Sequence, residues 1–297
     1  YFQDTGDGYE DRRFTRTSEE LRDYLMTNQS YDVERIYCTD AGTTPTNWNN
    51  GDYWWPVSGA PIPTELLRSS GYPWDGGETD IRAAVDSGCF ILNHRDHGSR
   101  AGWGDPFFQI PEVQTLDNGD LLPIVYSINC ETGWFDHETD DAGYGTSTEC
   151  FCEEFIRKTP GGCVCIFGAT RVSYSGYNDF LCRGWYDAVW PDFDLSIGGT
   201  DPMYRMGEIH NYGKWSMLNH YAWGDPWSYG ELTSEIFHVL GDPTMEITTE
   251  EPSSMVVSHP STYPFGTTQV VVNVSVDGAF VSLVQDGEII GTGYSSG

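Results

Sequence analysis

A histidine and a cysteine each follow a short apolar run of the sequence. Residues 89–95 lead to His97 and Gly98, and residues 122–128 lead to Cys130. Short apolar runs bounded by polar and turn residues are typical of buried strands in a parallel sheet. Because such sheets collect functional groups at the carboxyl ends of their strands, we expect an imidazole and a thiol at one edge. The pattern indicates a nucleophilic Cys/His site.

The chemistry of such a site assigns a role to each residue. A thiol attacks as its thiolate, so Cys130 needs a base, and His97 could take its proton. Gly98 lets the backbone approach a substrate, and its amide could bind a developing oxyanion together with the amide of Cys130. His94 is a second candidate base, but no glycine follows it. On these residues alone, a packed cysteine with an unrelated histidine stays an open alternative.

Further segments predict the elements that position this site. A capping box at Thr17 and Glu20 marks the start of a helix. Helices are predicted over residues 17–25, 64–67, 79–86, 148–158, 178–190, 203–220 and 231–240. Strands are predicted over residues 33–38, 89–95, 122–128, 161–169 and 241–247. Alternation of helices and buried strands predicts an α/β fold with a mostly parallel sheet.

Composition and charge exclude some classes of function. The 297 residues carry 15 Lys and Arg against 45 Asp and Glu, a formal charge of −30. A nucleic-acid partner is therefore not expected, because phosphate binding needs a basic stripe. No apolar run has the length of a membrane span. The acidity suits an extracellular or saline setting and would attract cationic peptides, so a preference for basic side chains is the first expectation.

The composition changes near residue 250. Residues 269–276 and 279–285 alternate apolar and polar side chains, and Asp286 with Gly287 forms a hairpin signal. We therefore predict a catalytic domain over residues 1–248. Residues 249–297 are predicted to form the start of a β-sandwich that is cut short.

Two metal sites are conceivable. Asp7 lies in an acidic turn-rich loop whose oxygen atoms could hold calcium, although a solvated loop is an equal alternative. The other site would be zinc held by four thiolates, which we disfavour because side chains two positions apart on a helix diverge. Its cysteines are Cys150, Cys152, Cys163 and Cys165.

Several motifs together carry a family resemblance. An apolar block ends in His-Gly-Ser, a later one ends in Cys130, and Trp103-Gly104 follows the first. Cys150-Phe151 with Glu153, and Leu240-Gly-Asp-Pro, continue the pattern. The chain resembles the gingipain family of caspase-like cysteine peptidases. This resemblance implies a caspase-like α/β/α sandwich followed by an incomplete immunoglobulin-like domain.

The resemblance also implies site residues. It makes His97 and Cys130 a catalytic dyad that forms a thioester acyl-enzyme, with the Gly98 amide in the oxyanion hole. No cofactor is required for that chemistry. Asp4 is the nearest match to the carboxylate that supports the histidine in the family. Glu153 is expected near the nucleophile loop or a structural calcium ion.

The specificity pocket is less clearly matched. Asp11 or Glu10 could form an acidic floor for a basic substrate side chain, and Ser173 and Tyr174 resemble a pocket wall. Arginine-specific members carry a Trp at the wall, so this chain departs from their pattern.

The resemblance implies a secreted endopeptidase with protein or peptide substrates. An amino-terminal subdomain of the family has no counterpart in these residues, so association with such a part of the same precursor is expected. Two alternatives remain: an inactive peptidase fold that binds peptides or glycans, and a thiol-dependent transpeptidase or amidase.

Overall fold

The computed structural model describes residues 1–51, 59–136, 149–199, 201–221, 229–251 and 254–296. The chain divides into two compact units, Tyr1–Ile247 and Thr248–Gly297, and each is described by itself.

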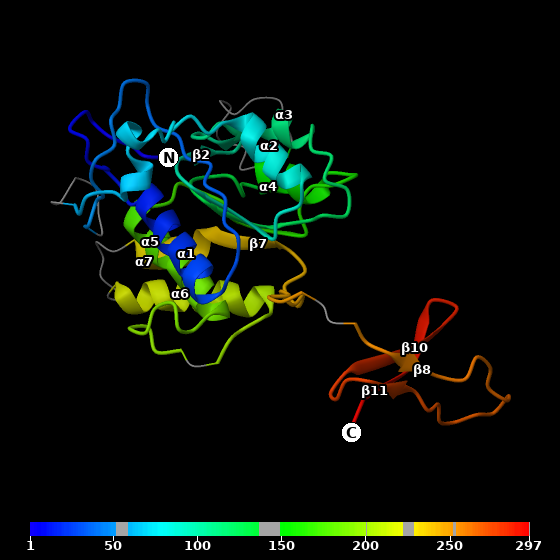
Figure 1. The fold of residues 1–297 in the computed structure, drawn as a ribbon. Coiled ribbons are helices and arrows are strands. Elements are labelled where there is room, and N and C mark those ends of the chain that lie inside the picture. The colour runs from blue at the N-terminus through cyan, green and yellow to red at the C-terminus, as the bar shows by residue number, and fades with distance from the viewer. Residues whose placement is uncertain (52–58, 137–148, 200, 222–228, 252–253, 297) are drawn as a thin grey trace. The chain divides into compact units, whose positions relative to one another are not determined.

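A four-stranded sheet forms the centre of the first unit (Figure 1). Its strands, in spatial order, are β1 (Ile91–Arg95), β5 (Ile124–Ile128), β6 (Cys165–Ala169) and β7 (Phe237–Gly241). The first three run parallel, and β7 is antiparallel to β6. Every residue of β5 and β6 is buried. The predicted mostly parallel sheet is confirmed.

Helices cover both faces of this sheet, because alternate strand residues point to opposite sides. Tyr126 and Phe167 face one helical layer, whereas Val125 and Ile166 face the other. The first layer holds α1 (Phe14–Asn28), α5 (Ser175–Val189), α6 (Met206–His220) and α7 (Gly230–Ile236). The second holds α2 (Glu78–Asp86), α3 (Ile110–Val113) and α4 (Phe151–Arg157). Figure 1 shows the resulting three layers.

Two glycines let α5 and α6 cross closely. A Cβ atom on Gly184 would lie 2.8 Å from the Cα of Gly213, and one on Gly213 would lie 2.3 Å from the Trp185 ring. Only hydrogen fits at these positions, so the two backbones pack directly against each other.

Short elements complete the unit. A small antiparallel sheet contains β2 (Gly98–Ser99), β3 (Gly102–Trp103) and β4 (Phe108–Gln109). The 3₁₀ helices are η1 (Thr64–Leu66) and η2 (Arg68–Ser70). Aromatic residues of the long insertion pack into their own small core, whose buried members are Phe2, Trp48, Ile62, Leu66 and Trp74.

Three predicted elements are wrong or displaced. Residues 33–38 form no strand, because Arg35 and Tyr37 donate hydrogen bonds to Glu19 of α1, which draws the segment toward that helix. The helix predicted to reach residue 240 ends at Ile236. Residues 237–241 instead pair with β6 as strand β7. The last strand of the sheet therefore lies earlier in the sequence than the strand predicted over residues 241–247.

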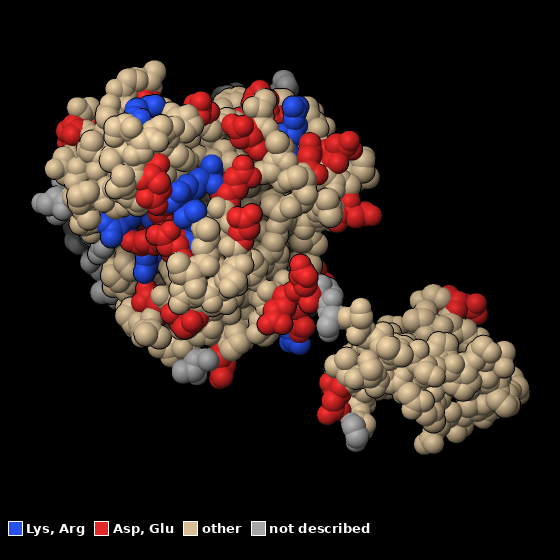
Figure 2. All heavy atoms as spheres, in the orientation of Figure 1, with Lys and Arg blue, Asp and Glu red and all other residues tan. Residues whose placement is uncertain are grey.

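Surface charge is predominantly negative. Figure 2 shows carboxylates scattered over this face of the first unit, with Lys and Arg in a few places among them. In the first unit, Glu20 forms ion pairs with Arg13, Arg16 and Arg183. None of the helices in the described ranges combines the length and apolar character that a membrane crossing needs.

The second unit contains two hairpin-like pairs. One joins β8 (Val257–Ser258) to β9 (Asn273–Val274), and the other joins β10 (Phe280–Gln285) to β11 (Glu288–Tyr294). Asp286 and Gly287 turn with φ of 53° and 85°, so the predicted hairpin is confirmed. The strand predicted over 269–276 is limited to β9. An immunoglobulin-like sandwich stays a prediction.

Candidate active site

Cys130 follows β5 in a turn that a buried polar network fixes. The Nδ2 atom of Asn129 lies 2.9 Å from Nδ1 of His94, and Asn129 Oδ1 accepts a 2.8 Å hydrogen bond from Thr132. Ser127 completes the network by contacting Thr132 and accepting a 2.8 Å bond from the Trp103 indole. Hydrogen bonds that link several buried side chains in this way rigidify the region that they connect. The network therefore defines where the chain turns into Cys130.

This network also gives His94 a structural role. The ring is buried, stacks on Trp103 at 4.2 Å and holds Asn129. Burial lowers its pKa well below the usual value. His94 thus supports the cysteine turn from behind.

The loop after β6 borders the thiol. The amide of Ser173 donates to the Cys130 Sγ at 3.3 Å, and the Ser173 hydroxyl donates to the carbonyl of Asn129 at 2.8 Å. Asn178 of α5 in turn donates to that hydroxyl at 2.6 Å. Ser173 therefore borders the Cys130 thiol, and its role in a pocket wall stays a prediction.

His97 and Gly98 lie directly against the cysteine turn. A Cβ atom on Gly98 would lie 2.7 Å from the side-chain amide of Asn129 and 2.9 Å from the carbonyl oxygen of Cys130. Backbone atoms of the two strand ends thus touch, and only glycine permits this approach. The structure brings the predicted base and the predicted nucleophile to neighbouring positions at one edge of the sheet.

A hydrogen bond fixes the tautomer of His97. Its Nε2 atom lies 3.1 Å from Oε1 of Gln3, which also accepts a 3.1 Å bond from Nε of Arg12. A guanidinium only donates, so the Gln3 atom is the carbonyl oxygen, and His97 must donate to it. Nδ1 then carries the lone pair and can accept a proton.

The surroundings keep this imidazole neutral. Although part of the ring is open to solvent, burial of its other side lowers the pKa of His97 to about 4, and the charges of Arg12 and Arg95 add to the effect. Phe14 packs edge-on against the ring at 5.3 Å. A neutral imidazole at neutral pH is the form that a general base requires.

Asp4 is not the partner of His97. Its carboxylate accepts hydrogen bonds from the backbone amides of Gly6, Asp7 and Gly8, which closes its own loop. Gln3, one position earlier, holds the imidazole instead. The prediction for Asp4 is therefore wrong, because a local turn satisfies its carboxylate.

Glu10 does not form a pocket floor. It is fully buried, and its carboxylate accepts bonds from the amides of Thr15 and Arg16 at the start of α1. Burial raises its pKa to about 8. The Glu10 prediction is wrong because this carboxylate caps a helix.

Asp11 is also largely buried, and Thr5 donates to its carboxylate at 3.4 Å. Burial and the nearby charges of Asp4 and Asp7 raise the pKa of Asp11. A pocket role for it stays a prediction. Tyr174 is partly exposed and stacks on Tyr229 at 3.9 Å, so it extends the surface that Ser173 begins.

The residues predicted for metals have structural partners. Asp7 accepts a bond from the amide of Tyr9, and Glu153 accepts one from the amide of Cys150 as part of a capping box. Within the described ranges, no three His, Cys, Asp or Glu side chains are grouped to hold a metal ion. Calcium binding stays a prediction, and residues 137–141 of the acidic loop after Cys130 lie outside the described residues.

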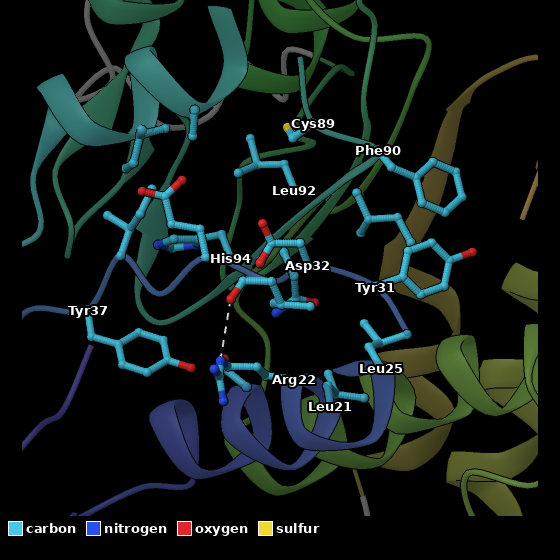
Figure 3. Close-up of a pocket in the computed structure, with 18 of the residues that line it drawn as sticks. Leu21, Arg22, Leu25, Tyr31, Asp32, Tyr37, Cys89, Phe90, Leu92 and His94 are labelled. Atoms are coloured by element: carbon cyan, nitrogen blue, oxygen red, sulfur yellow. Dashed lines mark hydrogen bonds between the residues drawn. The ribbon is translucent and has the colours of Figure 1, made fainter. Parts of the chain in front are cut away.

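A cavity of about 450 Å³ lies between α1 and β1 (Figure 3). Leu21 and Leu25 enter it from the helix, while Leu92 and His94 enter from the strand. Cys130 does not line it. The cavity therefore lies behind the cysteine turn and outside the candidate site.

Reasoning from sequence missed three residues of the site. Gln3, Arg12 and Asn129 all contact the predicted dyad or its supports. Asn129 had a local signal, since it ends the β5 run beside Cys130. Gln3 and Arg12 gave none, because their contacts join distant parts of the chain.

A thiol and an imidazole at neighbouring strand ends of a caspase-like sheet define a cysteine peptidase architecture. The chain belongs to peptidase family C25, whose model matches residues 2–248. The predicted resemblance to the gingipain family is thereby confirmed.

Curated relatives are distant and longer. Gingipain R2 of Porphyromonas gingivalis is 25% identical over 250 residues, which is 78% of this chain and 30% of that protein. Gingipain R1 of the same organism is 26% identical over 248 residues, which is 76% of this chain and 22% of that protein. The chain thus spans less than a third of the length of these relatives.

Solved structures share the fold. The crystal structure of the Arg-specific cysteine proteinase gingipain R matches with a TM-score of 0.61 at 23% identity, covering 78% of this chain and 52% of that one. A structure described as a protease matches with a TM-score of 0.60 at 18% identity, covering 95% of this chain and 63% of that one. These likenesses confirm the caspase-like fold.

Proposed function

We propose that this chain is a cysteine endopeptidase in which Cys130 is the nucleophile and His97 the general base. The observation that carries the proposal is the contact of Gly98 with Asn129 and Cys130, which leaves room for hydrogen alone. The neutral His97 supports it, since its Nε2–H is held by Gln3 and its Nδ1 can accept a proton.

The reaction follows from this arrangement. His97 Nδ1 takes the thiol proton as Sγ bonds to the scissile carbonyl carbon, and the carbonyl oxygen becomes an oxyanion. The amides of Gly98 and Cys130 would hold that oxyanion. The protonated His97 then gives its proton to the leaving amine as the C–N bond breaks. Water, deprotonated by the same nitrogen, hydrolyses the thioester and restores the thiol.

The test is cleavage of a fluorogenic peptide library in reductant, with and without calcium. We expect turnover by the wild-type chain and none by Cys130→Ala or His97→Ala. Cys89→Ala, which removes a free cysteine two residues before the start of β1, is the matched control and should keep full turnover. Equal cleavage by Cys130→Ala would refute the proposal.

An inactive, peptide-binding fold is the second candidate. If no peptide is cleaved yet library members bind the wild-type chain, this candidate would replace the first. A transpeptidase would share the acyl-enzyme, and an added amine acceptor captured in the product would reveal it. Secretion, a calcium requirement and a precursor partner are proposed by analogy with the family.

The preferred substrate residue before the cleaved peptide bond is a separate question. The net charge of −30 predicts a basic side chain. Glu10 caps α1 and therefore gives this preference no support, so the proposed basic preference rests on the net charge alone.

A further inference from the structure

The outer edge of β1 lies open along a cavity. β1 is the end strand of the four-stranded sheet, and within the described ranges no strand pairs with its other edge. The carbonyl of Phe90 accepts a 3.0 Å hydrogen bond from the amide of Ile124, so alternate backbone groups, starting from Phe90, face β5. The backbone groups of Ile91, Asn93 and Arg95 therefore face the open edge. Such groups form a template for a further strand.

The cavity of about 450 Å³ described above lies where a further strand of this sheet would run. β1 forms one side of it, and the segment 31–37, which forms no strand, forms the other. Leu21 and Leu25 of α1 close one face (Figure 3), whereas Ile81 and Ala84 of α2 close the other. The cavity thus passes through the plane of the sheet and meets a helix layer on each face.

The burial of β1 agrees with this position. Every residue of β5 is buried, whereas Ile91, Leu92 and Asn93 of β1 are only partly buried. A parallel strand that has helices over both faces is normally buried along its length. The apolar side chains of β1 are therefore incompletely covered beside the cavity.

Residues 1–3 lie at one end of this cavity. Phe2 pairs in parallel with Thr39, which follows the segment on one side of the cavity. Gln3 contacts His97, which follows β1 on the other side, through Oε1 and Nε2 at 3.1 Å. The stretch therefore enters between the same two segments that line the cavity.

The register of these two contacts extends into the cavity. Counting back from them, the positions before Tyr1 fall between residues 33–37 and residues 90–94. Both ranges line the cavity. A segment that runs into Tyr1 would therefore lie parallel to β1 and within reach of its open backbone groups.

We propose that this cavity is the binding site of an apolar β-strand, formed by a segment of about five residues that enters Tyr1 from the amino-terminal side and pairs in parallel with β1. Addition of a strand to an open edge supplies main-chain hydrogen bonds. Because apolar side chains of α1 and α2 face the cavity from opposite sides, the segment is apolar at successive positions. This interaction surface does not depend on the proposed peptidase function.

The experiment extends the chain before Tyr1 by Val-Ile-Val-Ile-Val and follows amide hydrogen exchange by NMR. Exchange at Ile91, Asn93 and Arg95 should slow at least about tenfold relative to the unextended chain, because a paired amide exchanges only when the strand opens. The amide of His94 already faces β5 and is the internal control, which should change much less. The midpoint of urea unfolding should rise as well.

A matched extension and two substitutions isolate the pairing. A Gly-Ser extension of the same length should leave the exchange rates of the unextended chain in place. In the Val-Ile chain, Ala84→Trp places an indole in the cavity and should abolish the protection. Arg82→Trp, an exposed position of the same helix that does not line the cavity, is the matched control and should keep it.

Three outcomes would overturn the inference. Equal exchange in the Val-Ile and Gly-Ser chains would show that the cavity takes no strand. Protection of the unextended chain that grows with its concentration would make the occupant a second copy. Equal protection by the same peptide added unlinked at equimolar concentration would make it a separate peptide, since linkage should raise its effective concentration. These comparisons need no substitution, so they decide the matter even if Ala84→Trp does not fold.

Discussion

The Nε2 atom of His97 donates to Oε1 of Gln3, a residue 94 positions earlier in the chain, at 3.1 Å. Because Arg12 also donates to that oxygen, the bond leaves Nδ1 as the basic nitrogen. An uncharged amide orients the imidazole here and provides no negative charge to stabilise its protonated form.

This pairing predicts an unusual pH profile. Since the pKa of His97 is about 4, the base stays neutral above that value, and kcat/KM should fall only as the pH drops toward 4. Gln3→Glu places a carboxylate beside Nε2, which favours the imidazolium and should move the acid limb up by about one unit or more. Profiles measured from pH 3.5 to 8 on a peptide with an uncharged residue before the cut check this. An unmoved limb would show that Gln3 does not govern His97.

Gly98→Ala should impair the site. The new Cβ would lie 2.7 Å from the Asn129 amide and would push the two strand ends apart. We expect a loss of about 1–3 kcal/mol in the free energy of unfolding, typical of overpacking, and a far larger fractional loss of kcat/KM. Gly104→Ala is the control, because its nearest contacts are 3.4 Å away. Full activity in Gly98→Ala would argue against the close approach.

Asn129→Ala should uncouple the cysteine turn from its support. Buried partners at His94 and Thr132 would lose a hydrogen bond, which costs about 1–3 kcal/mol. A nucleophile displaced by about 1 Å should lose on the order of 10²-fold in kcat/KM. Asn118→Ala, which removes a buried asparagine that bonds Gly162, should destabilise comparably and keep kcat/KM. Equal kinetics in both variants would contradict the positioning role.

Glu10 should make stability depend on pH. Its folded pKa of about 8 exceeds the ordinary 4.5, so the folded state binds the extra proton between these values. The contribution is complete below pH 4.5 and is lost as the pH rises through 8. Urea unfolding at pH 5 and pH 8 should show the wild type losing about 1–3 kcal/mol more than Glu10→Gln, since each pKa unit corresponds to about 1.4 kcal/mol.

The control for that measurement is Glu112→Gln, which changes a half-buried carboxylate that bonds the amide of Gln109 at the start of α3. It should leave the pH dependence of the wild type in place. Parallel losses in the wild type and Glu10→Gln would mean that Glu10 does not titrate in this range.

The local sequence pattern was sufficient to predict the two strands that precede His97 and Cys130. The run before Cys130 is apolar because β5 is buried on both faces, and the sequence pattern detects such burial directly. The run before His97 forms β1, an edge strand that is buried only at His94 and Arg95. The sequence pattern failed at residues 237–241, where an apolar stretch fits a helix equally well. Pairing of Phe237 with Ala169 of β6 decides the outcome there, and no local signal encodes that pairing.

The candidate site was likewise predictable where local sequence determines it, and unpredictable where long-range contacts do. Residue types identified the nucleophile and base candidates, whereas the family resemblance suggested Asp4 and Glu10 as working carboxylates. Both accept hydrogen bonds from backbone amides close to them in the sequence, which is a consequence of turn and helix-cap geometry. The groups that do reach the site, Gln3 and Arg12, depend on how the amino-terminal loop folds back over β1.

The close crossing of α5 and α6 has a consequence for binding. Ser175, on which both Arg12 and Arg95 converge, is the first residue of α5, and Gly184 locks that helix against α6. The guanidinium groups are therefore anchored to a stiff part of the scaffold. The loop that places Ser173 beside Cys130 leads directly into this helix, so a bound peptide would meet a preorganised surface and lose less conformational entropy to loop ordering.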